Sequence, residues 1–292
     1  MHPETRPSFY LNTRKNLFYC HGCGQGGELI RFVQLSRHLS FRQSLAHLEP
    51  QIAPADPADL LEHAAAFYQR QLSRHPEALR YLEGRRVQDP VVIQELQIGY
   101  APGGNLRRHL TTQGYPLELL RRAGLVNPQG RDTFYRRLVF PCRQDGRVVN
   151  LYGRSIGDTF AHRFLPGPKG GLVAWESVRQ FSNVILVEGL FDLAVLWQAG
   201  FRNTTCAFGT HLTPLQFHQL SQPPDRLVYI VFDQDQNQAG QRTAHQLARR
   251  LAGVCIPARV VHLPAGQDPN GYFVAGAAAA DFAECLEGVH PL

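Results

Sequence analysis

The sequence predicts an α/β protein, α+β overall, with a central parallel sheet near its carboxyl end, a mixed α+β subdomain before that sheet and a small metal-binding unit at its amino end. Three observations support this prediction. Strand-like and helix-like stretches alternate after residue 182, a hairpin pattern lies within residues 133–154, and Cys20-His-Gly-Cys23 stands near the start. With 292 residues, 43% of them apolar, the chain is long enough to form more than one core.

The amino-terminal unit is predicted from two of its cysteines. In a Cys-x-x-Cys knuckle two thiolates chelate Zn²⁺, and the nearby Gly26-Gly27 lets the backbone fold tightly around the ion. A redox Cys-x-x-Cys is the alternative, but no thioredoxin-like strand and helix pattern surrounds Cys20 and Cys23. We therefore expect a structural zinc unit over residues 1–49.

Prolines mark the end of this unit. Pro50, Pro54 and Pro57 each fix their own φ and lack a backbone donor, so neither a helix nor a sheet can run through them. We expect a linker over residues 50–57. The following stretch, residues 58–82, is rich in helix formers with apolar residues near helical spacing, and it should open a larger domain.

A hairpin is predicted further along this domain. Leu138-Val-Phe140 and Val148-Val-Asn-Leu-Tyr152 are short apolar runs, and Asp145-Gly146 between them is a strong signal for a two-residue turn. The pattern predicts antiparallel sheet within a mixed α+β subdomain over residues 58–181.

The remaining part, residues 182–292, alternates between strand-like and helix-like runs. The strand-like runs are 184–187, 204–208, 227–232 and 258–263, and the helix-like runs are 190–199, 214–220 and 239–251. Such alternation predicts βαβ units around a buried parallel sheet.

Acidic residues follow three of these predicted strands. Glu188 comes directly after the first strand, Asp233 and Asp235 follow the third, and Asp268 follows the fourth after a short loop. Because the carboxyl ends of parallel strands meet at one edge of a sheet, we expect these side chains to lie close together. Asp192 should face the same edge from the first turn of the next helix.

This grouping of carboxylates predicts a metal site. A single carboxylate at a strand end is commonly a helix cap or a solvated loop residue. Clustered carboxylates without cations repel one another, however, and hard oxygen ligands suit Mg²⁺ or Mn²⁺. Such ions polarise phosphoryl oxygens and favour attack by a hydroxyl group or water. We therefore predict metal-dependent phosphoryl chemistry at this edge.

Three motifs in this region resemble a known family. Glu188-Gly-Leu-Phe-Asp192, Ala207-Phe-Gly-Thr-His-Leu-Thr213 and Asp233-Gln-Asp235 followed by Ala239-Gly240 are similar to the Toprim domain of bacterial DnaG-type primases. The resemblance implies that Glu188, Asp233 and Asp235 are catalytic and, with Asp268, hold Mg²⁺ or Mn²⁺. This sequence departs from the family pattern at Asn270, where a second late aspartate is common.

The resemblance extends upstream of the Toprim region. Leu79-Arg-Tyr-Leu-Glu-Gly-Arg-Arg86, Gln97-Ile-Gly-Tyr-Ala-Pro102, Arg137-Leu-Val-Phe-Pro141 and Gly146-Arg-Val-Val-Asn-Leu-Tyr-Gly-Arg154 are similar to the first part of the primase catalytic core. By position, four basic residues should hold the template and the incoming nucleotide: Arg137, Arg154, Arg163 and Lys169.

The start of the chain, His2-Pro-Glu-Thr-Arg-Pro-Ser-Phe9, resembles the start of the primase zinc-binding domain. That domain begins Cys-x-x-His, which implies that His2, Cys20 and Cys23 bind Zn²⁺ and that a fourth ligand would lie before Met1. A late start assignment, a trimmed sequence, or a site completed by water or His21 would each account for the missing cysteine.

The same unit contains aromatic side chains that have two readings. They either stack on a single-stranded template or form a small core, and they are Phe9, Phe18, Tyr19 and Phe32.

Composition agrees with a polyanionic partner. The formal charge of +6 and the pI near 9.1 come mainly from Arg, whose planar fork fits phosphate oxygens. No run of about twenty apolar residues and no apolar signal core is present, so we expect a cytoplasmic protein without membrane contact.

The resemblance implies a DNA primase, a DNA-directed RNA polymerase that makes short RNA primers on single-stranded DNA from nucleoside triphosphates. The alternatives are a Toprim nuclease and a non-catalytic nucleic-acid-binding replication accessory. The sequence stops soon after the Toprim region, so we expect a short primase of the mobile-element type that does not dock on a helicase through the usual carboxy-terminal domain.

Overall fold

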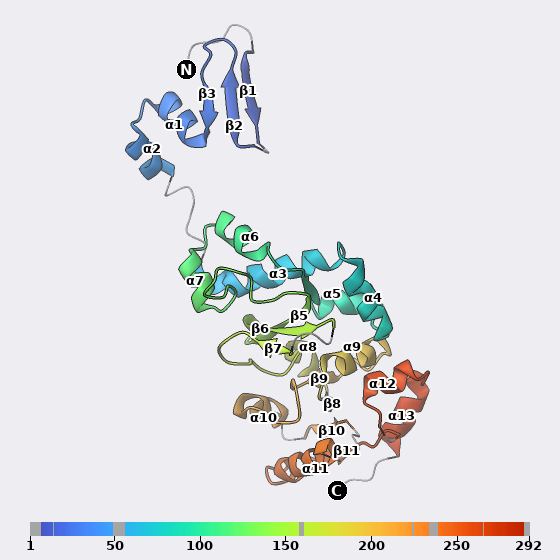
Figure 1. Cartoon of the computed structure of the whole chain (residues 1–292). Helices are drawn as coiled ribbons and strands as arrows, with labels where there is room; N and C mark the ends of the chain where they lie inside the picture. Colours follow the sequence, from blue (N-terminus) through green and yellow to red (C-terminus); the bar gives the residue numbers. More distant parts are fainter. Residues whose placement is uncertain are drawn as a thin grey trace. The chain divides into compact units, whose positions relative to one another are not determined.

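The computed structural model describes residues 7–13, 15–48, 56–157, 161–223, 225–233, 239–264 and 266–288. The chain folds as two compact units, Met1–Asp56 and Pro57–Leu292. The expected linker at 50–57 falls largely outside the described residues. Figure 1 labels the helices and strands of both units.

The first unit is a three-stranded antiparallel sheet followed by two helices. Its elements are β1 (Phe9–Asn12), β2 (Leu17–Cys20), β3 (Gly26–Glu28), α1 (Leu29–Arg37) and α2 (Phe41–Leu48). Phe18 lies 5.8 Å from Phe9 and 5.4 Å from Phe32 between ring centroids, so these three rings form a small core. Tyr19 points to the other face of β2, where it is 47% exposed and pairs in register with Tyr10.

The second unit opens with a helical layer. It comprises η1 (Pro57–Asp59), α3 (Leu60–Leu72), α4 (Pro76–Gly84), α5 (Pro90–Glu95), α6 (Leu106–Thr112) and α7 (Leu117–Arg122). The helical stretch predicted over 58–82 is thus two helices, because Pro76 cannot extend α3 but suits the first turn of α4. Asp89 caps α5 by accepting a bond from the Val91 N–H over 2.8 Å.

The predicted hairpin is present and belongs to a four-stranded antiparallel sheet of order β4-β5-β6-β7. The strands are β4 (Gly99–Ala101), β5 (Arg137–Gln144), β6 (Arg147–Ser155) and β7 (Arg163–Phe164). Asp145 and Gly146 form the turn with φ of 51° and 78°, the left-handed values that a type I′ turn needs.

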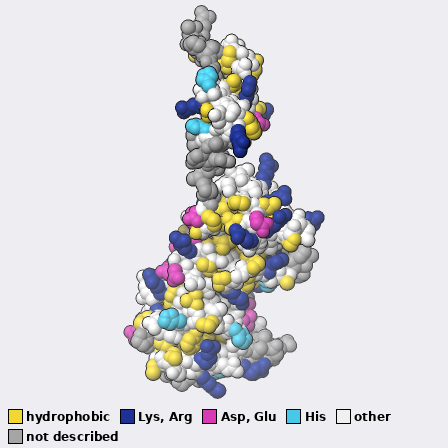
Figure 2. All heavy atoms as spheres, turned by 90° about the vertical axis from the view of Figure 1, so that its left-hand side faces the viewer, with side chains coloured by type: hydrophobic (Ala, Val, Ile, Leu, Met, Phe, Trp, Pro, Cys, Tyr) yellow, Lys and Arg dark blue, Asp and Glu magenta, His cyan; other side chains and the backbone are white. Residues whose placement is uncertain are grey.

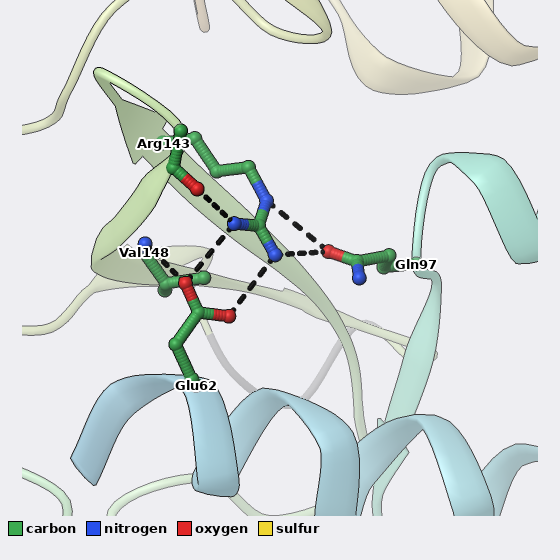
Figure 3. A network of polar contacts seen from close by, with 5 residues as sticks. Glu62, Gln97, Arg143 and Val148 are labelled. Carbon is green, nitrogen blue, oxygen red and sulfur yellow. Dashed lines mark hydrogen bonds and ion pairs between the residues drawn. The ribbon is translucent and has the colours of Figure 1, made fainter. Parts of the chain in front are cut away.

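Arg143 attaches this hairpin to the helical layer (Figure 3). Its guanidinium makes a two-pronged ion pair with Glu62 of α3 at 3.0 and 3.1 Å, and its Nη2 donates to the Gln97 side chain over 2.6 Å. Glu62 also accepts a bond from the Val148 N–H over 2.7 Å. One arginine therefore joins α3, the segment before β4 and both hairpin strands.

The carboxy-terminal part contains the predicted parallel sheet, with strand order β11-β10-β8-β9. Its strands are β8 (Asn183–Val187), β9 (Thr204–Cys206), β10 (Leu227–Val231) and β11 (Ala258–Val260). Its helices are α8 (Trp175–Val178), α9 (Leu190–Gln198), α10 (Pro214–Leu220), α11 (Ala239–Ala252), α12 (Pro269–Val274) and α13 (Ala279–Glu287). Figure 1 shows α9, α12 and α13 on one side of the sheet and α10 and α11 on the other. Right-handed crossovers place α9 on the face opposite α10 and α11.

The two sheets of the second unit share one hydrophobic core. Tyr100, Leu138 and Phe140 from the antiparallel part belong to the same buried cluster as Val187 and Phe191 from the parallel part. The regions predicted as 58–181 and 182–292 therefore pack as one body. Figure 2 shows basic side chains spread over the face that it displays, with apolar side chains between them. Within the described ranges, no helix has the length and apolar character that a bilayer crossing needs.

Candidate functional site

The ends of the two central parallel strands lie against each other. Glu188 follows β8, Asp233 lies two residues beyond β10, and the Asp233 N–H donates to Glu188 Oε1 over 3.1 Å. Gly240, near the start of α11, packs against Asp233 and Glu188. A Cβ at Gly240 would lie 2.4 Å from the Asp233 carbonyl oxygen and 3.1 Å from Glu188 Oε1, so only glycine allows this approach.

Asp192 reaches the same edge from the first turn of α9. It is 5% exposed, and its two carboxylate oxygens accept bonds from the Gly189 N–H (3.1 Å) and the Asn270 N–H (2.9 Å). The first bond closes the start of α9, and the second fixes the start of α12 beside it. Backbone donors therefore hold this carboxylate in one orientation.

Asp268 completes the group as the N-cap of α12, where its Oδ1 accepts the Gly271 N–H. Carboxylate oxygens of Asp192, Asp233 and Asp268 all lie within 4.8 Å of one another. Opposite ligands of a cation bound at about 2.1–2.5 Å are roughly 4–5 Å apart, so these oxygens can share one ion with small side-chain adjustments. The residues therefore fit a divalent metal.

The electrostatics of Asp192 also favour a cation. Burial raises the pKa of Asp192 well above its ordinary value, and the charges of Asp268 and Asp233 raise it further. In their ionised forms the three carboxylates repel one another, which costs free energy. A bound cation would remove that cost.

These acids line a cavity of about 330 Å³ that also contains two arginines and an aromatic wall. Its lining comprises Arg85, Phe140, Tyr152, Arg154, Glu188, Gly189, Leu190, Phe191, Asp192, Phe208, Gly209, Asp233, Asp268 and Asn270. The guanidinium groups of Arg85 and Arg154 lie 5.3 and 5.5 Å from the ring centroid of Phe191. The cavity thus brings two guanidinium groups close to clustered carboxylates.

The structure places the four predicted basic residues differently from one another. Arg154 lines the acidic cavity. Arg137 is 5% exposed, and its Nη1 donates to the carbonyl oxygens of Gly153 (3.1 Å) and Ala161 (2.7 Å). Arg163 and Lys169 are exposed, and the Lys169 ammonium lies 5.0 Å from the ring centroid of Phe164.

Two predicted ligands, His2 and Asp235, lie outside the described residues. In the other direction, sequence reasoning did not assign Asp192 as a ligand, although its spacing from Glu188 placed it at the right edge. Arg85 was not predicted as a site residue at all. It belongs to the motif at 79–86, but the chain folds it into the cavity from 103 residues before Glu188.

In the first unit, Cys20 and Cys23 occupy a tight turn at the end of β2 and are not joined by a disulfide. The Gly24 N–H donates to the Cys20 carbonyl oxygen over 2.8 Å, and Gly24 has a φ of 70°. This turn fits a zinc knuckle. The alternative ligand His21 packs edge-on against Tyr19, with ring centroids 4.9 Å apart.

Three protein families match consecutive parts of the chain. The CHC2 zinc finger matches residues 1–56, the N-terminal domain of the DNA primase catalytic core matches 67–172, and the Toprim domain matches 183–279. The zinc-finger match supports Zn²⁺ in the first unit, and the Toprim match implies a divalent metal at the acidic edge.

Similar proteins carry the same domains. The DNA primase of Aquifex aeolicus is 31% identical over 297 residues, which cover 93% of this chain and 59% of the relative. The DNA primase of Pseudomonas aeruginosa is 30% identical over 340 residues, which cover 100% of this chain and 50% of the relative. The chain thus spans little more than half the length of these curated relatives.

Solved structures agree with the sequence comparisons. The zinc-binding and RNA polymerase domains of the Aquifex aeolicus primase superpose with a TM-score of 0.72 at 29% identity, covering 100% of this chain and 77% of that chain. The DnaG primase catalytic domain bound to ssDNA superposes with a TM-score of 0.67 at 26% identity, covering 84% of this chain and 83% of that chain.

Proposed function

Because the chain belongs to the family of bacterial DnaG-type DNA primases, we propose that it synthesises short RNA primers on single-stranded DNA. The reaction joins the 3′-hydroxyl of one nucleotide to the α-phosphate of an incoming nucleoside triphosphate and releases pyrophosphate. One observation carries the proposal. Clustered carboxylates and two arginine forks line a single cavity at the carboxyl ends of β8 and β10.

We propose that the carboxylates hold Mg²⁺ or Mn²⁺. The proposed ligands are Glu188, Asp192, Asp233, Asp235 and Asp268. The set offers only oxygen atoms, which favours hard cations over the softer metals that prefer nitrogen or sulfur. A divalent cation held by these carboxylates would polarise a phosphoryl oxygen and stabilise the leaving oxygen.

The arginines of the cavity would bind the anionic substrate. Arg85 and Arg154 can each donate two hydrogen bonds to a phosphate and so orient the α-phosphate for in-line attack. Buried Arg137 bonds the carbonyl oxygen of Gly153, so we propose that it supports the strand position of Arg154. Exposed Arg163 and Lys169 are suited to contact the template or nucleotide phosphates from outside the cavity.

We propose that the first unit binds the template strand. Tyr10 and Tyr19 form an exposed cross-strand pair, and both rings contact His21 edge-on at centroid distances of 5.5 and 4.9 Å. Such rings offer faces on which unpaired bases stack. Zn²⁺ held by Cys20, Cys23 and His2 would maintain the turn beside this face. In this division, residues 1–49 recognise template, and 58–181 with 182–292 form the catalytic body.

The test incubates the protein with single-stranded DNA, nucleoside triphosphates and Mn²⁺ or Mg²⁺. The template DNA and the nucleotides carry different fluorescent labels, so that template and RNA product are followed separately. The proposal expects template-dependent RNA products with an intact template. A Toprim nuclease would instead shorten the template without incorporating nucleotides, since the same metals can activate water. That result would overturn the primase assignment.

A further inference from the structure

Asn270 makes a two-way contact with Arg85 in the wall of the cavity. Its Nδ2 donates to the Arg85 carbonyl oxygen over 2.7 Å, and its Oδ1 accepts from Arg85 Nη1 over 3.4 Å. Asn270 is 1% exposed and lies 185 residues from Arg85 in sequence. This one side chain therefore bonds both the backbone and the guanidinium of the same residue.

The backbone part of this contact has a clear structural reason. Arg85 is the C-cap residue of α4, where the chain leaves the helix and carbonyl groups lose their helical partners. The Asn270 amide satisfies that carbonyl from the start of α12, so it links the helical layer to the parallel part. The Asn270 N–H also donates to Asp192 Oδ1, which ties the same residue to the acidic group.

The groups that contact the Arg85 guanidinium are neutral. The ion pairs found in the described part of the chain do not include Arg85. Its side chain rests on the rings of Tyr81 and Phe191, at 5.8 and 5.3 Å, and on the neutral oxygen of Asn270. Its positive charge therefore remains available to an anionic ligand.

We propose that Asn270 is a positioning residue that fixes Arg85 in the cavity while leaving its charge available to the triphosphate of an incoming nucleotide. The inference rests on the proposed function, because it assumes a nucleotide substrate. An amide suits this role since it donates to a carbonyl and accepts from a guanidinium at once. An aspartate here could not donate to the Arg85 carbonyl, and its carboxylate would form an ion pair with the guanidinium.

The test is a double-mutant cycle on nucleotide affinity, measured by equilibrium dialysis of a labelled ribonucleoside triphosphate with Mg²⁺. We expect Asn270→Ala and Arg85→Ala each to weaken nucleotide binding about tenfold. The coupling between the two substitutions should then have the size that is usual for contacting residues. The double variant should bind no more than about twofold worse than Arg85→Ala, because Asn270 acts through Arg85. Fully additive losses would overturn the inference.

Asn270→Asp provides a nearly isosteric second test. It should weaken nucleotide binding at least as much as Asn270→Ala, and wild-type affinity would contradict the role of an uncharged partner. The matched control is Asn203→Ala, which removes a similar amide-to-carbonyl bond (Asn203 Nδ2 to the Asn183 oxygen, 3.1 Å) away from the cavity and should not change affinity.

Circular dichroism melting shows whether each variant is folded at the dialysis temperature. If the wild-type protein binds no nucleotide, both the proposed function and the role of Asn270 are contradicted. If the wild type binds and Asn270→Ala binds equally well, the inference alone fails.

Discussion

The Asp233 N–H donates to Glu188 Oε1 over 3.1 Å, and this bond joins the ends of the two central strands of the parallel sheet. It holds one oxygen of the Glu188 carboxylate beside the backbone that follows β10. The same side chain lines the cavity together with Asp192, Asp233 and Asp268. A substitution that keeps the hydrogen-bond acceptor of residue 188 but removes its charge should therefore lower activity without lowering stability.

Glu188→Gln is that substitution. Its amide oxygen can still accept the Asp233 N–H, so the melting temperature should stay within a few degrees of the wild-type value. Primer synthesis should fall by at least about 100-fold, as expected when a charged group of a polar active site is lost. Nucleotide incorporation and circular dichroism melting measure the two effects. Exposed Glu118→Gln is the matched control and should be active. Wild-type rates for Glu188→Gln would contradict the assignment.

The two faces of β2 should respond oppositely to mutation. Tyr19→Ala removes an exposed ring and should weaken binding of a fluorescent single-stranded oligonucleotide about tenfold, the loss of roughly one stacked base. Phe18→Ala should instead unfold the small unit, because Phe18 is 4% exposed at the centre of its core. Fluorescence anisotropy measures affinity. Phe41→Ala, which removes another exposed ring of the unit, is the control. Equal affinities of Tyr19→Ala and Phe41→Ala would exclude the proposed template face.

His162 should titrate below its ordinary pKa of about 6.5. Partial burial lowers the pKa of His162 most, and the charges of Arg154, Arg137 and Arg85 lower it further. Its Nδ1 accepts the Ser155 N–H over 3.3 Å, a bond that protonation would break. Since the folded protein then binds fewer protons than the unfolded chain, stability is lost as pH falls from about 6.5 through the lowered pKa.

An NMR titration of the His162 Cε1 proton, assigned with His162→Gln, measures this value directly. Arg154→Ala should raise the pKa of His162, because it removes a nearby positive charge. A value of about 6.5 or above in the wild type, unchanged in Arg154→Ala, would show that the arginines do not act on this ring.

Arg143 should matter for stability rather than for chemistry. Arg143→Ala leaves Glu62 and Gln97 without their shared donor (Figure 3). It should lower the free energy of unfolding by roughly 1–3 kcal/mol, since the Arg143 and Glu62 side chains are only about one third exposed. Urea unfolding measures this loss. Arg147→Ala, an exposed arginine of the same hairpin, should cost little. If the two variants unfold alike, the network does not hold the hairpin to α3.

The sequence was informative wherever local pattern decides structure. Apolar runs ending in Glu188 and Asp233 predicted the strand ends, and Asp145-Gly146 predicted a turn that requires two left-handed residues. The sequence left Phe18 and Tyr19 with the same two interpretations, whereas strand β2 places Phe18 in the core and Tyr19 on the exposed face. That depends on Phe9 and Phe32, which come from other elements.

Contacts between distant segments were beyond the sequence patterns. The ion pair of Arg143 with Glu62 joins residues 81 apart, and the contact of Asn270 with Arg85 joins residues 185 apart. Such pairs depend on how helices pack onto sheets, which local periodicity does not encode. The acidic residues were predicted because they follow apolar strand runs in the sequence. Arg85 and its bond to Asn270 were not predicted, because they depend on this packing.

The carboxylates of this cavity are proposed to bind a divalent cation. Mn²⁺ titration followed by electron paramagnetic resonance measures such binding, because the signal reports free Mn²⁺. Any Mn²⁺ that binds at the cysteine site contributes equally to all variants, because these variants differ only in the acidic group. We expect the wild-type protein to bind Mn²⁺, with affinity reduced at least about tenfold in Asp233→Asn and in Asp192→Asn, as for loss of one charged ligand. Equal Mn²⁺ binding by the wild type and both variants would contradict a metal site at these carboxylates.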